Sequence, residues 1–149
     1  MEHFRSYSAV FPILLCTRDG QRQILLHRRE NTGFMDGKWD FAGSGHVDEG
    51  ETAKMAVARE CKEELGIEVA LQDVQFRHLS HRASAGGRTY YDIYFEVLRY
   101  DGAPEIREPQ KSSALCWFDL DSLPPDMIPV RREALFQVLS GCPYSESLE

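Results

Sequence analysis

The stretch from Gly45 to Ile67 restricts the possible folds of this chain more than any other, because both ends and both faces of a helix can be recognised in it. Between Thr52 and Leu65 there is no glycine or proline and helix-forming residues dominate, while Gly66 supplies a stop signal. Thr52 is a suitable N-cap, with acidic residues just before it near the positive end of the helix dipole. We therefore expect an α-helix over 52–65.

The acidic residues of this helix are spaced so that three carboxylates come together. At about 100° per residue, Glu60 and Glu64 lie within roughly 40° of each other, and Glu63 lies roughly 60° to the other side of Glu60. Small apolar residues such as Ala56 occupy the same sector, so the strip is expected to be partly buried. Like charges on such a strip repel one another unless a cation or protons neutralise them. A Glu-rich surface helix with chance spacing is the alternative interpretation.

The chemistry of this strip favours a hard divalent cation. No Cys or His stands at a metal-binding spacing from another Cys or His. Carboxylates without such partners select Mg²⁺ or Mn²⁺ over zinc. Because Mg²⁺ retains several waters and shares its coordination shell with substrate phosphates, the strip predicts a ligand that bears phosphate.

Composition limits the partners and the compartment. The 149 residues and the 42% hydrophobic content suffice for a core, and we expect a single domain over 1–149. A formal net charge of −7 argues against a nucleic-acid partner, since such binding needs clustered Lys and Arg. The longest apolar run, 9–16, is too short to span a membrane, and the four cysteines form no C-x-x-C pair. We expect a cytoplasmic protein with reduced thiols and no membrane partner; a homodimer remains open.

Turn signals divide the rest of the chain into strands. Asp19-Gly20 separates two apolar runs and is typical of a hairpin, as is Ala85-Gly86-Gly87 between two longer strand-forming runs. Two glycines, an Asn and an Asp-Gly pair mark 30–39 as a loop. The expected strands are 8–17, 23–28, 74–82, 88–100 and 114–119.

A second helix is expected near the C-terminus. The segment 129–140 is amphipathic, and its expected buried side consists of Ala134, Leu135, Val138 and Leu139. Strands and two helices in this order predict the α/β (α+β) class, with a mixed β-sheet sandwiched between helices.

These residues resemble the signature of the Nudix hydrolase family, G-x5-E-x7-R-E-U-x-E-E-x-G-U, in which U is a bulky apolar residue. Every fixed position is matched, with Cys61 and Ile67 at the U positions; the fixed residues are Gly45, Glu51, Arg59, Glu60, Glu63, Glu64 and Gly66. The segments 25–39 and 108–130 are similar to a common bacterial branch of the family. The usual Pro-Gly-Gly or Pro-Ser-Gly before the signature is replaced by Ala42-Gly43-Ser44-Gly45. The resemblance implies the Nudix fold.

The resemblance also implies hydrolysis of a nucleoside diphosphate linked to another group, X, with assistance from Mg²⁺ or Mn²⁺. It assigns the metal to Glu60, Glu63, Glu64 and the carbonyl of Gly45. Glu63 is also a catalytic candidate, Arg59 is expected to orient the glutamates by ion pairing, and Glu51 to position a ligand or the loop. A general base outside the signature is common in the family; Glu108 is our first candidate and Glu96 the second.

Candidate substrate contacts lie just before the signature. Arg28 and Arg29 close a strand and can contact phosphates, although only one of them can face the site on an alternating strand. Phe34 and Trp39 can frame a base or belong to the core. The resemblance favours a nucleoside triphosphate pyrophosphohydrolase of MutT type. Hydrolysis of a nucleotide sugar, ADP-ribose or a dinucleotide remains an alternative, as does a nucleotide-sensing module that binds without cleaving.

Overall fold

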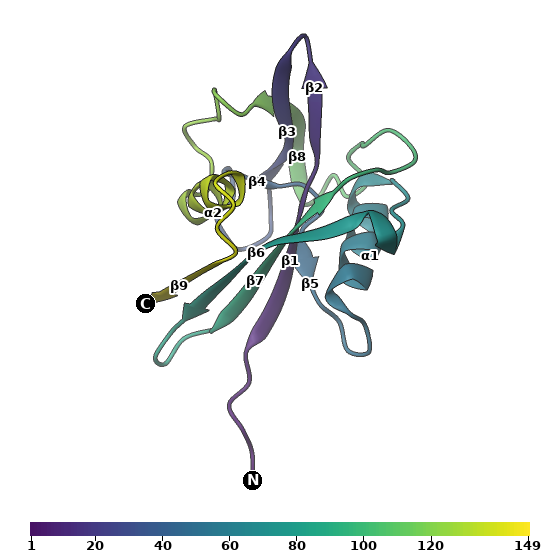
Figure 1. The fold of residues 1–149 in the computed structure, drawn as a ribbon. Coiled ribbons are helices and arrows are strands. Elements are labelled where there is room, and N and C mark those ends of the chain that lie inside the picture. Colours follow the sequence, from purple (N-terminus) through teal and green to yellow (C-terminus); the bar gives the residue numbers. More distant parts are fainter.

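The central strands bury side chains on both faces and so build two separate hydrophobic cores, as a computed structural model of residues 1–149 shows. Along β1 (Tyr7–Ile13), Val10 belongs to one core, whereas Ala9 and Phe11 belong to the other. This alternation is the period-two geometry of a strand covered on both sides. The helix α1 (Ala53–Leu65) covers the first core and α2 (Pro129–Leu139) the second, on opposite sides of the strands (Figure 1). The expected α+β class, with strands layered between helices, is confirmed.

The strands form two sheets. The first consists of β1 together with β5 (Gly45–His46), β6 (Val74–Ala83), β7 (Tyr90–Val97) and β9 (Tyr144–Leu148). Its strand order is β5-β1-β7-β6-β9, in which β1 runs parallel to β7 and β6 parallel to β9. The second sheet is antiparallel and consists of β2 (Leu15–Arg18), β3 (Gln21–Arg29), β4 (Trp39–Phe41) and β8 (Ser112–Asp119). A short 3₁₀ helix, η1 (Leu71–Asp73), precedes β6.

The single strand expected over 8–17 is in fact two strands that belong to different sheets. The chain leaves the first sheet at Leu14, which is fully buried and whose carbonyl accepts a hydrogen bond from the Leu25 amide at 3.1 Å. An uninterrupted apolar run gives no sign of such a crossing, because both sheets bury their residues equally well. The expected hairpin is present, and Asp19 and Gly20 adopt φ angles of 51° and 77°, as a tight two-residue turn requires.

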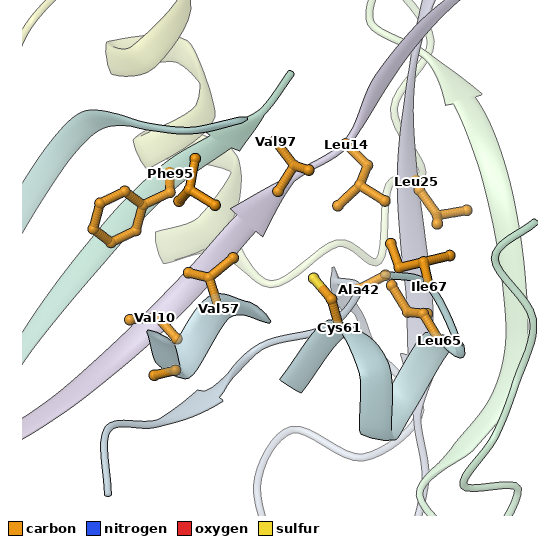
Figure 2. Close-up of a cluster of buried hydrophobic side chains, with 12 residues drawn as sticks. Val10, Leu14, Leu25, Ala42, Val57, Cys61, Leu65, Ile67, Phe95 and Val97 are labelled. Carbon is orange, nitrogen blue, oxygen red and sulfur yellow. The ribbon is translucent and has the colours of Figure 1, made fainter. Parts of the chain in front are cut away.

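Both expected ends of α1 are present. The Thr52 hydroxyl accepts a hydrogen bond from the Met55 amide at 3.2 Å, and Gly66 ends the helix in the left-handed conformation, with φ 70°. The apolar face of the helix, including Val57, Cys61 and Leu65, packs onto the first core (Figure 2). This packing fixes the rotation of α1 and therefore the direction of its acidic strip.

The buried side of α2 differs from the expected one. It consists of Arg131, Ala134 and Leu135; Val138 is only half-buried, and the prediction for Leu139 is wrong because this residue is 41% exposed. The buried stripe follows the i, i+3, i+4, i+7 pattern from Arg131, and Leu139 lies outside it. The expected face contained apolar residues only, so it left out Arg131 and included Leu139.

The C-terminal strand β9 was not expected from the sequence. It pairs with β6 at the edge of the first sheet, and four of its five residues are exposed, so it lacks a hydrophobic pattern. All four cysteines are free, but only Cys61 is fully buried and Cys116 is exposed. Neither helix is long and apolar enough to cross a membrane.

Candidate active site

A polar cleft of about 850 Å³ lies where both sheets and both helices meet. Glu60 and Glu64 of α1 line it, together with Asp40 of β4, Asp92 of β7 and Arg131 of α2. Most of the other lining residues are also polar or charged. Such a cleft suits a small, highly polar ligand whose charge is compensated by side chains of both signs.

The acidic strip of α1 lies directly against β5. Gly45 pairs with Val10 of β1 and lines the cleft beside Glu60. A Cβ atom at Gly45 would overlap the carboxyl group of Glu60, so only glycine allows this approach. Gly45, Glu60 and Glu64, three of the four residues expected to hold the metal, therefore line one cleft.

Burial makes the negative charge of this strip costly. Burial and, after it, the nearby carboxylates of Glu60 and Glu108 together raise the pKa of Glu64 to about 8. The pKa of Glu60 is also raised, mainly by burial, although its hydrogen bond to Arg59 acts in the opposite direction. A bound cation would relieve both the desolvation and the repulsion, and the all-oxygen donor set is the one that Mg²⁺ and Mn²⁺ prefer.

Arg59 joins three glutamates in one network of ion pairs. Its guanidinium donates to both carboxylate oxygens of Glu51, at 3.1 and 2.7 Å, and to Glu60 Oε1 at 2.7 Å. A longer bond of 3.3 Å reaches Glu63, which is half-exposed. Glu51 also accepts from the Asp48 amide at 2.7 Å, which ties the loop before α1 to the same network. Arg59, Glu51 and Glu63 stand beside the cleft and do not line it.

The two candidate general bases have different surroundings. Glu108 lies close enough to Glu60 and Glu64 to raise their pKa values, and it pairs with Lys111 at 3.5 Å. Lys111 itself lines the cleft and was missed in the sequence, where it stands in a polar loop without a distinguishing pattern. Glu96 instead accepts two bonds from Arg77, at 3.0 and 2.7 Å, and neither Glu96 nor Glu108 lines the cleft.

The four candidate substrate contacts separate into two pairs. Arg29 and Phe34 line the cleft, and the guanidinium of Arg29 lies 5.3 Å from the centre of the Phe34 ring. Arg28 points elsewhere and donates to the Gly37 carbonyl at 3.0 Å. Trp39 packs edge-on against Phe118, with 4.8 Å between ring centres, and belongs to the second core.

A buried cluster of charges at the bottom of the cleft was not foreseen. Arg131 contacts Asp40 (Nε to Oδ1, 3.2 Å) and Asp92 (Nη1 to Oδ2, 3.2 Å), and it donates to the Tyr94 hydroxyl at 3.0 Å. The ion pair with Asp40 is close but not aligned as a hydrogen bond. Burial lowers the pKa of Arg131, but its three partners raise it more, so the guanidinium stays charged. An Asp inside an apolar strand was the one sequence signal for this cluster.

The chain is similar to several known proteins. Residues 7–138 match the family model of the NUDIX domain. A CTP pyrophosphohydrolase of Escherichia coli is 35% identical over 100 residues, which cover 67% of each chain. A putative 8-oxo-dGTP diphosphatase 2 of Mycobacterium tuberculosis is 35% identical over 109 residues, covering 69% of this chain and 73% of the relative. The crystal structure of a MutT NUDIX hydrolase from Burkholderia pseudomallei has a TM-score of 0.76 and 30% identity, over 91% of this chain and 99% of that one.

Proposed function

The chain belongs to the Nudix family and is a hydrolase, and from this premise we propose that it cleaves nucleoside triphosphates with the help of Mg²⁺ or Mn²⁺. The products would be a nucleoside monophosphate and pyrophosphate. The observation that carries this proposal is the placement of Glu60 against Gly45, with Glu64 lining the same, largely polar cleft. Two carboxylates buried so close together are costly unless a cation accompanies them.

The donor set fits the proposed metal. Glu60, Glu64 and the carbonyl of Gly45 would hold it, and the half-exposed Glu63 would complete the set. When bound, the metal neutralises phosphate oxygens and lowers the pKa of a coordinated water. Arg59 would keep the carboxylates oriented, because its bidentate pair with Glu51 fixes the guanidinium while its Nη1 donates to Glu60 and Glu63.

The other cleft residues would bind and orient the substrate. Lys111 and Arg29 supply positive charge near the acidic strip and would contact phosphate oxygens. Phe34 would stack on the base, since its ring is 43% exposed and lines the cleft. Glu108 does not line the cleft, but its charge acts on Glu60 and Glu64 and it makes no hydrogen bond to either, so it would accept the proton of the attacking water.

The names of two relatives support a triphosphate as the substrate. One is a CTP pyrophosphohydrolase and the other a putative 8-oxo-dGTP diphosphatase, and each is 35% identical to this chain. Both named substrates are nucleoside triphosphates with different bases. We therefore propose the triphosphate group, rather than a particular base, as the common element, in preference to a nucleotide sugar, ADP-ribose or a dinucleotide.

A substrate panel tests the proposal. The purified protein is incubated with Mg²⁺ and with CTP, GTP, 8-oxo-dGTP, a nucleotide sugar, ADP-ribose or a dinucleoside polyphosphate, and the products are separated by chromatography. We expect triphosphates to yield monophosphate and pyrophosphate, and no product without a divalent cation. Release of orthophosphate instead of pyrophosphate, or turnover of ADP-ribose or a nucleotide sugar alone, would overturn the proposal.

A further inference from the structure

A buried histidine borders the cleft with one ring nitrogen that has no partner in the protein. His27 of β3 is only 6% exposed and lines the same cleft as Glu60 and Glu64. Its Nδ1 lies 2.8 Å from the Ser112 hydroxyl, whereas its Nε2 is buried and makes no hydrogen bond. Because buried polar side-chain atoms are paired in the large majority of cases, an unpaired one beside a cleft needs an explanation.

A second buried histidine provides the comparison. His78 of β6 is fully buried and does not line the cleft. Both of its nitrogens are bonded, Nδ1 to the Cys142 carbonyl at 2.7 Å and Nε2 to the Ser145 hydroxyl at 2.8 Å. Both nitrogens of His78, away from the cleft, are thus bonded, whereas His27, which lines the cleft, has one nitrogen without a partner.

The surroundings of His27 determine which nitrogen carries the proton. Burial lowers the pKa of His27, so the ring is neutral near pH 7 and has a single N–H group. Asp40 faces His27 in the β3–β4 register, and Glu60 and Glu64 line the same cleft. Of the charged groups that act on the ring, Asp40 has the larger effect and favours an N–H over a lone pair, while Arg29 acts in the opposite direction. The Ser112 hydroxyl would then donate to Nδ1, which leaves the proton on Nε2.

An N–H donor in this position fits an anionic oxygen. We propose that the Nε2–H group of His27 donates a hydrogen bond to a phosphate oxygen of the bound nucleotide, which makes His27 a substrate-binding residue. This inference rests on the proposed function, because that function brings phosphates to the acidic strip. The Ser112 hydroxyl acts through His27 and is a positioning group, since it selects the tautomer that donates.

Nuclear magnetic resonance of the histidine side chains tests the inference directly. Long-range ¹H–¹⁵N spectra of the ¹⁵N-labelled protein with Mg²⁺ are recorded before and after saturation with an α,β-imido nucleoside triphosphate, which resists cleavage. We expect the Nε2–H resonance of His27 to shift downfield, while both nitrogens of His78 keep their positions. Unchanged His27 resonances in a saturated complex would overturn the inference, and so would failure of the analogue to bind at all.

Matched variants separate binding from folding. We expect His27→Leu to weaken the affinity for the analogue by about tenfold or more, because a hydrogen bond to a charged group is lost. Ser112→Ala should weaken it less, and His78→Gln should leave it unchanged among variants that melt cooperatively. Equal affinities of wild type and a folded His27→Leu would contradict the inference. If the analogue shifts the His27 resonance but the wild type cleaves no triphosphate, the proposed function fails and the inference stands. If the wild type cleaves triphosphates but the His27 resonance does not shift, the proposed function stands and the inference fails.

Discussion

Gly45 shows how one missing side chain shapes the acidic strip. Its φ is not positive, so backbone strain does not explain why glycine stands there. The explanation is the carboxyl group of Glu60, which occupies the space that a Cβ atom would need.

The substitution Gly45→Ala should therefore displace Glu60 without unfolding the protein. We expect the affinity for Mg²⁺ or Mn²⁺ to fall by about 10- to 100-fold, the range found when the surroundings of a metal ligand are disturbed. Calorimetric titration with Mn²⁺ measures this, and circular dichroism checks the fold. A folded variant with the affinity of the wild type would show that Glu60 is not a ligand.

Glu64 gives the metal-free protein a distinctive dependence on pH. The pKa of its carboxyl group rises from 4.5 to about 8, first because of burial and then because of Glu60 and Glu108. Between these values the folded state binds more protons than the unfolded state, so the contribution of Glu64 to stability falls as the pH rises.

We expect the melting temperature of the wild type in EDTA to fall, relative to that of Glu64→Gln, as the pH rises from about 5 to 8. The comparison with Glu64→Gln removes the contributions of other titrating groups. Added Mg²⁺ should raise the melting temperature of the wild type again at the alkaline end of this range, because the metal binds the ionised carboxylate. If the melting temperatures of the two proteins changed in parallel with pH across this range, the raised pKa assigned to Glu64 would be contradicted.

At the scale of single elements, α1 owes its position to local signals at both ends. The Thr52 cap and the left-handed Gly66 enclose the helix, and the buried face between them sets its rotation. Each of these features depends on residues a few positions apart, so the sequence alone predicts the helix and the direction of its acidic strip. Its boundaries agree with the expected ones to within a residue.

The substitution Thr52→Ala should lower the free energy of unfolding by about 1 kcal/mol, because the Met55 amide loses its acceptor. Urea unfolding followed by circular dichroism measures this difference. Lys54→Ala serves as the control, since it changes the first turn of α1 but not the cap. An effect of Thr52→Ala no larger than that of the control would mean that the cap does not stabilise the helix.

At the scale of the whole molecule, Arg131 connects parts that are far apart in the sequence. Its partners Asp40 and Asp92 belong to different sheets, and Arg131 itself belongs to α2. Its guanidinium also lies 3.7 Å above the ring of Phe11. One side chain thus joins both sheets to the second helix at the bottom of the cleft.

We expect Arg131→Met to destabilise the protein by about 3 kcal/mol, since loss of one partner leaves buried carboxylates less well compensated. This loss is at the lower end of the range for breaking a buried ion pair, because Arg29 still pairs with Asp40 and Arg82 still pairs with Asp92. Denaturant unfolding measures the loss. A variant as stable as the wild type would show that the cluster contributes little net stability.

The same long-range contacts explain what the sequence could not predict. The crossing at Leu14 follows from the pairing of β1 with the distant β7, and the edge strand β9 and the burial of Arg131 also depend on partners that are distant along the chain. A charged residue in a helix is normally assigned to solvent, and only the acids of two other elements reverse that assignment for Arg131. Arg28 and Trp39 are candidates that the sequence could not separate from Arg29 and Phe34, because the loop between β3 and β4 determines which of them reach the cleft.

The central claim is that Glu60 and Glu64 hold the divalent cation on which hydrolysis depends. The most direct test measures triphosphate hydrolysis over a range of Mg²⁺ concentrations for the wild type and for Glu64→Gln. Glu68→Gln is the control, because Glu68 is exposed and pairs only with Lys62. We expect Glu64→Gln to lose at least about 100-fold in kcat/KM, since even outer-shell changes at metal sites cost 10- to 100-fold, and the control to match the wild type. Wild-type turnover by Glu64→Gln at saturating Mg²⁺ would contradict the claim.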